Sequence, residues 1–146
     1  MRLLLAASLL VACGGGAHHH GTPIEGDPGH LYVEVTASGD QEDALEDGAR
    51  AALARMPFAV PVDDRGQIEL EASVAELSSR GDATTCRVKV MVLRLPKDAL
   101  VGLAEGTARA RGTGDQAAAD CVEHLAGTLI KGKVRGLLRR ELRDRR

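Results

Sequence analysis

Aromatic side chains are nearly absent from this chain of 146 residues, which has one phenylalanine, one tyrosine and no tryptophan. Proteins that bind single-stranded nucleic acid stack its bases on aromatic rings, so we expect no nucleic-acid partner. The core must be built from alanine, valine and leucine, which bury less area per residue than aromatic side chains do.

Sequence motifs of hydrolases and metalloproteases are also missing. The chain contains neither Gly-x-Ser-x-Gly nor His-Glu-x-x-His, and its acidic pair Asp63-Asp64 is typical of a turn. Cys121 and His124 lie one helical turn apart, but a structural zinc site needs four placed ligands. We therefore expect a non-catalytic protein without metal or cofactor, and keep a small hydrolase or metal-binding protein as an alternative.

No apolar run is long enough to cross a membrane as a mature helix. The longest, Leu3–Val11, follows Arg2 and has nine residues, whereas a spanning helix needs about 20. Its length and its basic start are typical of an export signal. Leu10-Val11-Ala12-Cys13 follows and resembles the lipobox of bacterial lipoproteins. This resemblance implies that the Cys13 thiol carries a diacylglycerol and that the signal is cut before it.

Four segments are expected: a signal peptide at 1–12, a lipidated flexible tether at 13–30, an α+β domain at 31–130 and a basic helical extension at 131–146. Glycine and proline recur in the tether. Its tract His18-His19-His20 is interpreted as solvated linker, with weak metal binding as the alternative. The residue after Cys13 is Gly14 rather than aspartate. A residue other than aspartate at this position resembles the signal for an outer-membrane destination.

Alternating apolar residues predict five strands, and helical periodicity predicts two helices. The motifs Ser38-Gly39-Asp40-Gln41 and Thr113-Gly114-Asp115-Gln116 are interpreted as capping boxes that open the helices, with a direct cap by Asp40 as the alternative for the first helix. The predicted fold is α+β: a two-layer sandwich with a mainly antiparallel sheet of four to five strands and both helices on one face, in the order β-α-β-β-β-β-α. The strands are expected at 31–36, 58–62, 67–77, 84–95 and 99–111.

Small residues alternate along the last predicted strand, where they should let a helix pack close to the sheet. In the hairpin before it, Glu69 and Glu71 are expected near Lys89 and Arg87. The order of elements is similar to that of the small α/β domains of envelope lipoproteins, such as the curli-secretion-channel lipoprotein, the activator lipoprotein of penicillin-binding proteins and the N-terminal domain of the Tol-system periplasmic protein. No functional residue is carried over from these families.

Cys86 and Cys121 remain once Cys13 is assigned to the lipid. Strand alternation and helical spacing turn both towards the space between sheet and helices, and export would place them in an oxidising compartment. A disulfide between them is expected, with two buried free thiols as the alternative.

Charge is distributed unevenly. Residues 31–130 contain 17 acidic and 10 basic residues, a net charge of −7, whereas residues 131–146 contain 8 basic and 2 acidic, a net charge of +6. The basic segment is interpreted as an amphipathic helix with a solvated charged face. A contact with an anionic membrane surface is the sharper hypothesis, and its candidate residues are Lys131, Lys133, Arg135, Arg139, Arg140 and Arg143.

These patterns lead to a functional prediction: an exported protein, anchored by lipid on Cys13 to the outer membrane, that binds an envelope protein or supports assembly. A membrane-surface module that acts through the basic segment is the alternative.

Overall fold

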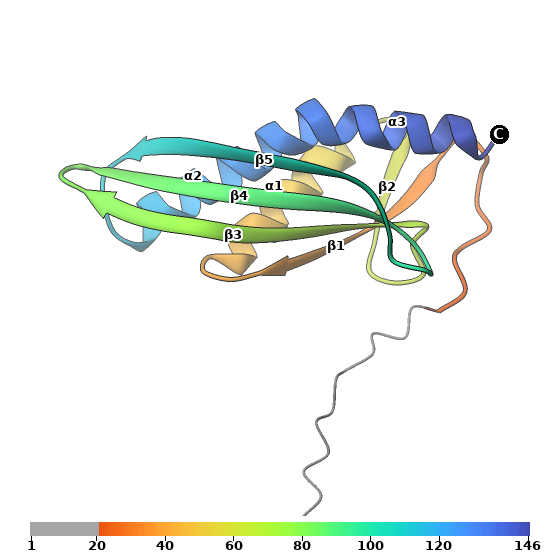
Figure 1. Cartoon of the computed structure of the whole chain (residues 1–146), viewed down its shortest axis with the longest axis horizontal. Coiled ribbons are helices and arrows are strands. Elements are labelled where there is room, and N and C mark those ends of the chain that lie inside the picture. The colour runs from red at the N-terminus through yellow and green to blue at the C-terminus, as the bar shows by residue number, and fades with distance from the viewer. Residues whose placement is uncertain (1–20) are drawn as a thin grey trace, which may run out of the picture.

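A five-stranded sheet in the order β2-β1-β3-β4-β5 forms one layer of the protein, which we describe from a computed structural model over residues 21–146 (Figure 1). Cys13 and the predicted signal and histidine tract lie outside the described residues. The strands are β1 (Leu31–Ser38), β2 (Ala59–Val62), β3 (Ile68–Arg80), β4 (Ala83–Arg94) and β5 (Ala99–Arg111).

The sheet is mixed. Strand β1 runs parallel to both of its neighbours, and β3, β4 and β5 form an antiparallel meander. Strand β2 pairs with Leu31–Glu34 of β1 and β3 pairs with Val33–Ser38 on its other side, so the loop 63–67 only has to cross from one side of β1 to the other. The α+β class and the order β-α-β-β-β-β-α are confirmed.

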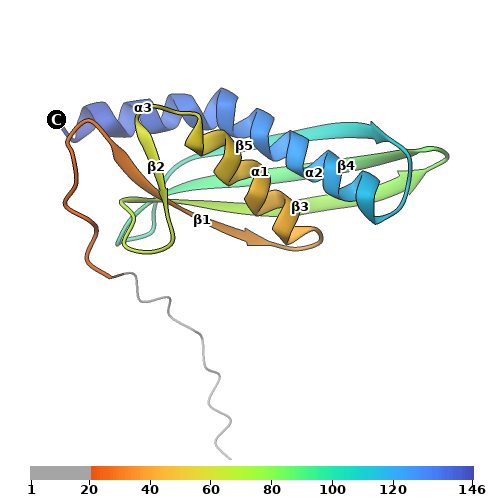
Figure 2. The ribbon, with the colours of Figure 1, turned by 180° about the vertical axis from the view of Figure 1, so that it is seen from behind.

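The second layer consists of helices on one face of the sheet (Figure 2). They are α1 (Glu42–Ala54), α2 (Asp115–Leu129), the π-helical turn η1 (Ile130–Val134) and α3 (Arg135–Asp144). Leucines and valines from both layers form the core between them. Helices α1 and α2 cross at Gly48, where a Cβ would lie 2.5 Å from the carbonyl oxygen of Glu123.

The groove of small residues on β5 receives leucines of the helical layer, as expected. A Cβ at Gly102 would lie 2.7 Å from Leu137, and one at Gly106 would lie 3.1 Å from Leu129. The absence of these side chains lets the helices approach the sheet closely.

Both predicted capping boxes are wrong. Helix α1 begins after Gln41, which has a φ of 64°, and α2 begins after Gly114; neither helix has a side-chain cap. The Gln116 side chain instead donates a hydrogen bond to Asp120 over 2.8 Å. Backbone turns with positive φ, rather than serine or threonine caps, redirect the chain before each helix.

The predicted pairing of Glu69 and Glu71 with Lys89 and Arg87 is also wrong. Glu69 lies opposite Leu93, and Glu71 lies opposite Met91. The hairpin turns later than predicted, because β3 and β4 stay paired as far as Arg80 and Ala83, and this displaces the register by several residues. The bulge between Val74 and Glu76 changes the register by one residue only.

The basic segment 131–146 continues directly from α2 and packs along the body. Its apolar stripe is buried and consists of Val134, Leu137, Leu138 and Leu142. In the described part of the chain, no helix is long and apolar enough to cross a membrane.

Candidate interaction surfaces

The face of the sheet opposite the helices carries an apolar patch at the β4–β5 hairpin. Cross-strand register places Met91 opposite Leu103 and Leu93 opposite Leu100. Leu100 is 64% exposed and Leu103 is 37% exposed, and they are the large hydrophobic residues that the described chain leaves open to solvent. We call Met91, Leu93, Leu100 and Leu103 the hairpin patch.

Strand β5, which supplies half of the hairpin patch, is an edge strand. It is 13 residues long, and it has β4 on one side and no other strand of the described chain on its outer side. A long unpaired edge next to exposed leucines is a surface on which another chain can add a strand.

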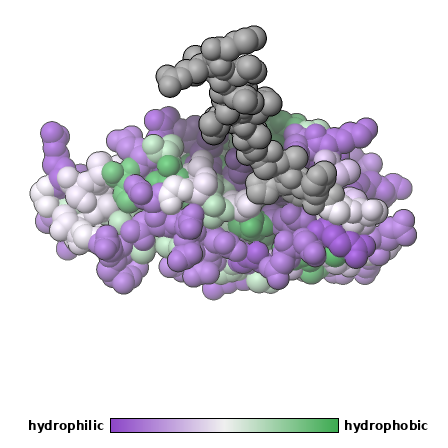
Figure 3. Space-filling view, turned by 90° about the horizontal axis from the view of Figure 1, so that it is seen from below, coloured by the Kyte–Doolittle hydropathy of each residue, from purple (hydrophilic) through white to green (hydrophobic). Residues whose placement is uncertain are grey.

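One side of the molecule is mainly polar. The side of the molecule that faces downward in Figure 1 is hydrophilic over most of its visible area, with small separate hydrophobic areas (Figure 3). Arg87 on the open sheet face forms an ion pair with Glu105 across β4 and β5, at 2.5 Å.

The other feature of interest is the basic end of α3. Arg139, Arg143 and Arg146 surround a hollow of about 490 Å³ whose remaining lining is Phe58, Gly136 and Leu142. The Arg139 guanidinium lies 5.6 Å from the centre of the Phe58 ring, a distance at which a cation is attracted to an aromatic face. We call this hollow the arginine pocket.

The described N-terminal segment lies at the same end of the molecule as the arginine pocket (Figure 1). The backbone N–H of Leu31, where β1 begins, donates to the carbonyl of Phe58 over 2.8 Å. The pKa of Asp27 is lowered, chiefly by the hydrogen bond from the Gly29 amide and to a smaller extent by the charges of His30 and Arg146. The segment that leads back towards Cys13 therefore passes the basic end of α3 near Asp27. It then lies against the loop before β3, where the Ile24 backbone N–H donates to the Arg65 carbonyl over 2.8 Å.

The six residues predicted to contact an anionic surface do not share one environment. Lys131, Lys133, Arg139, Arg140 and Arg143 are exposed, whereas Arg135 is partly buried, and its Nε has no hydrogen-bond partner in the described part of the chain. Lys131 lines a separate hollow between α1 and α2, together with His124 and Glu123. The exposed charges therefore spread along the helix, and of these six residues Arg139 and Arg143 line the arginine pocket, together with Arg146.

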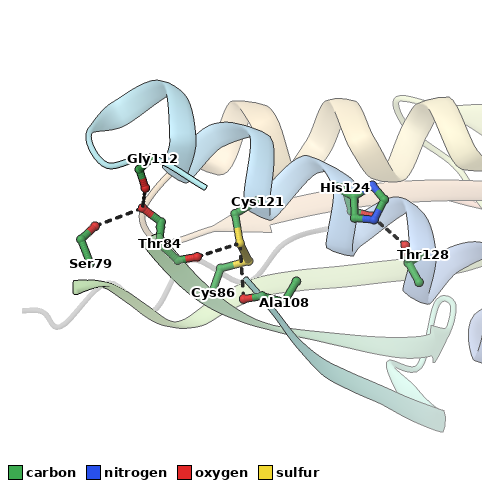
Figure 4. The surroundings of a disulfide bond; sticks show 8 residues. All are labelled: Ser79, Thr84, Cys86, Ala108, Gly112, Cys121, His124 and Thr128. Atoms are coloured by element: carbon green, nitrogen blue, oxygen red, sulfur yellow. Dashed lines mark hydrogen bonds between the residues drawn. A yellow bond between two sulfur atoms is a disulfide. The ribbon is translucent and has the colours of Figure 1, made fainter. Parts of the chain in front are cut away.

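The expected disulfide between Cys86 and Cys121 is present, with a Cα–Cα distance of 6.2 Å (Figure 4). It joins β4 to α2, and the Cys121 sulfur lies 3.5 Å from the carbonyl oxygen of Ala108 on β5. The buried Thr84 lies close by and donates to the Gly112 carbonyl over 2.9 Å. A bonded Cys121 has no thiolate to offer a metal, and His124 points away from it on the exposed side of α2.

No group of three or more histidine, cysteine, aspartate or glutamate residues that could hold a metal ion occurs within residues 21–146. The most buried carboxylate is Glu141, which is 3% exposed and accepts two hydrogen bonds from Arg94, over 2.7 and 2.9 Å. This pair joins α3 to β4.

Sequence reasoning missed Phe58, Leu100 and Leu103 as surface residues. Leu103 lies on the same face as Glu105, so strict alternation along the strand could have identified it. Leu100 could not be placed in this way, because the register shifts between Val92 and Leu93 and moves Leu100 opposite Leu93. Phe58 becomes a site residue only through its tertiary contact with α3.

No protein-family model and no curated protein matches the sequence. Among solved structures, the chain is similar to protein XCC0632 of Xanthomonas campestris, ascribed to family DUF330, with a TM-score of 0.55, 17% identity, and coverage of 84% of this chain and 93% of that one.

The chain is also similar to PelC of Paraburkholderia phytofirmans, whose structures are dodecamers. One crystal form gives a TM-score of 0.54 with 14% identity, over 76% of this chain and 93% of PelC. The L103M form of PelC gives 0.51 with 17% identity, over 81% and 93%. At these identities the likeness shows a shared fold, so this chain has the same small α+β fold as XCC0632 and PelC.

Proposed function

We propose that this protein is a non-catalytic lipoprotein of the bacterial envelope that works by assembling with other subunits, in the first place with copies of itself. The observation that carries the proposal is the hairpin patch beside the unpaired edge of β5. Leu100 is 64% exposed there, and proteins seldom leave a long edge and large apolar side chains open together unless a partner covers them.

Two further observations support the proposal. PelC, which has the same fold, is a dodecamer. The leader Met1–Ala12 and Cys13 fit a lipid-anchored protein, and many copies held on one membrane surface meet at a high local concentration.

The experiment is sedimentation velocity of the full chain in a neutral detergent over a range of concentrations. We expect the wild type to associate, and Leu100→Glu with Leu103→Glu to weaken association by roughly tenfold or more, because two charges would enter the interface. The matched control Ser78→Glu with Thr113→Glu adds the same charge at exposed positions outside the patch and should associate like wild type.

A wild type that stays monomeric throughout, or equal association of both double variants, would overturn the assembly proposal.

A second candidate function is a contact with the membrane surface through α3. The specific observation in its favour is that the segment leading back to Cys13 passes beside the basic end of α3, where Asp27 lies close enough to Arg146 for the charges to interact. A lipid anchor and a basic patch at one end would face the bilayer together, and each lysine or arginine near an anionic surface contributes about 1 kcal/mol.

Partition of the full chain between anionic and zwitterionic vesicles tests this second function, because any lipid anchor contributes equally to both. We expect a preference for anionic vesicles that declines with added salt. An equal distribution at low salt would refute it.

A further inference from the structure

The arginine pocket combines positive charge with an apolar floor. Its three arginines stand around the Phe58 ring and Leu142, which is 9% exposed. At about 490 Å³, the hollow has the size of sites that hold small ligands. A ligand that satisfies such a lining must be both anionic and partly apolar.

The cations in the pocket are available to a ligand. Neither Arg139 nor Arg143 forms an ion pair within the described residues. They lie four residues apart, and so stand one above the other on the same face of α3. Asp27 offsets part of the charge of Arg146, so Arg139 and Arg143 carry the argument.

The two guanidinium groups suit phosphate oxygens. A guanidinium presents planar, paired N–H donors that match the oxygens of phosphate, and such charge-assisted hydrogen bonds are stronger than neutral ones. The Phe58 ring holds the Arg139 guanidinium at 5.6 Å from its centre, which restricts the side chain before a ligand arrives.

The floor adds selectivity for a ligand with a hydrocarbon part. Phe58 is half-buried and Leu142 is nearly buried. Gly136 forms part of the rim, and nothing lies within 4 Å of where its Cβ would be. A glycerol backbone with the first carbons of its acyl chains could therefore lie against Phe58 and Leu142.

We propose that the arginine pocket binds the phosphate headgroup of an anionic phospholipid, with Arg139 and Arg143 on the phosphate and the glycerol end against Phe58 and Leu142. The choice of a lipid rests on the second function proposed above, which places this end of the body at the membrane. Binding in the pocket would fix how the body stands on the bilayer.

The chain has a single phenylalanine, which gives a site-specific probe. Selective labelling of Phe58 in the full-length protein, held in a neutral detergent, yields the NMR signals of one ring. We would titrate it with short-chain phosphatidylglycerol, with phosphatidylcholine of the same chain length, with glycerol phosphate and with inorganic phosphate. We expect saturable shifts with phosphatidylglycerol, and binding at least roughly tenfold weaker for the other three.

The variant Arg139→Gln with Arg143→Gln should weaken phosphatidylglycerol binding by roughly tenfold or more, since two charge-assisted contacts are lost. Arg109→Gln with Arg111→Gln removes the same charge from exposed positions at the far end of β5 and should bind like wild type. Thermal unfolding of both variants checks that each is folded.

The lipid site is overturned if Phe58 does not respond, if the two double variants lose affinity equally, or if inorganic phosphate or an acidic peptide displaces the lipid at equal concentration. These soluble ligands test the pocket whether or not Cys13 carries lipid. A negative result with these soluble ligands would therefore overturn the lipid site alone. The preference of α3 for anionic vesicles is measured separately by the vesicle experiment.

Discussion

At the scale of single residues, the ion pair between the buried Glu141 and the exposed Arg94 links stability to pH. Arg94 lowers the pKa of Glu141 from 4.5, first by hydrogen bonding and then by its charge, against the opposing effect of burial. A lowered folded-state pKa stabilises the protein above the unfolded value, and this stabilisation is lost as pH falls through the folded pKa. We expect wild type to lose stability below about pH 4.5. We expect Glu141→Gln to be less stable at neutral pH, and its free energy of unfolding to change less with pH in the acid range.

Urea unfolding at a series of pH values measures this effect. The control is Glu105→Gln, which breaks the pair with Arg87 on the surface, where both side chains are at least one third exposed; exposed pairs contribute little to stability. If Glu141→Gln followed the wild-type pH dependence, the pair would have no part in acid unfolding.

At the scale of elements, the crossing of α1 and α2 depends on a missing side chain. Alanine favours a helix over glycine by about 1 kcal/mol, yet a Cβ at Gly48 would meet the Glu123 carbonyl oxygen at 2.5 Å. We expect Gly48→Ala to destabilise the protein by about 1–3 kcal/mol, because the helix backbones must separate. Gly132→Ala adds a Cβ with nothing within 4 Å and should be neutral or stabilising in the same denaturation assay. A stabilised Gly48→Ala protein would contradict the close crossing.

The disulfide ties two other elements, β4 and α2, across 35 residues. In the chain-entropy model, closing a loop of this length contributes about 3–4 kcal/mol by restricting the unfolded chain. Cys86→Ser with Cys121→Ser should therefore lower the free energy of unfolding by about that amount. Reduction should destabilise wild type similarly and leave the double variant unchanged. The disulfide would be contradicted if Cys86 and Cys121 could both be alkylated in wild-type protein that has not been reduced.

At the scale of the whole molecule, the lipid anchor at Cys13 decides the compartment and remains a prediction. We expect intact-mass analysis of protein from its native host to show a chain that begins at Cys13 and carries acyl groups. Cys13→Ala should abolish both the cleavage and the added mass, because the thiol is the acceptor of the lipid. A full-length, unmodified wild-type chain would remove the basis for the envelope role.

The core of the whole molecule includes buried residues of the basic segment. Removing residues 131–146 would take away Val134 and Leu138, which are fully buried, together with the partner of Arg94. Loss of a large buried apolar side chain costs about 2–5 kcal/mol, so truncation should unfold the protein rather than report on membrane binding. Neutralising exposed arginines leaves this core intact and is the sharper test.

The sequence by itself determined the elements and their faces. Local alternation predicted β5 at 99–111, and its small residues predicted the close helix contact later found at Gly102 and Gly106. Strand and helix periodicity also predicted that Cys86 and Cys121 face each other. These features depend on the side-chain period within one element, which a linear pattern contains.

Only the tertiary structure decided the register, the parallel placement of β1 and the two candidate surfaces. Pairing of β3 with β4 as far as Arg80 and Ala83 moved Glu69 away from Lys89, and a register shift next to Leu93 exposed Leu100. Phe58 and Arg139 lie 81 positions apart in the sequence and meet because α3 folds back along the body. Such features depend on how separate elements pack together, and no local pattern carries that information.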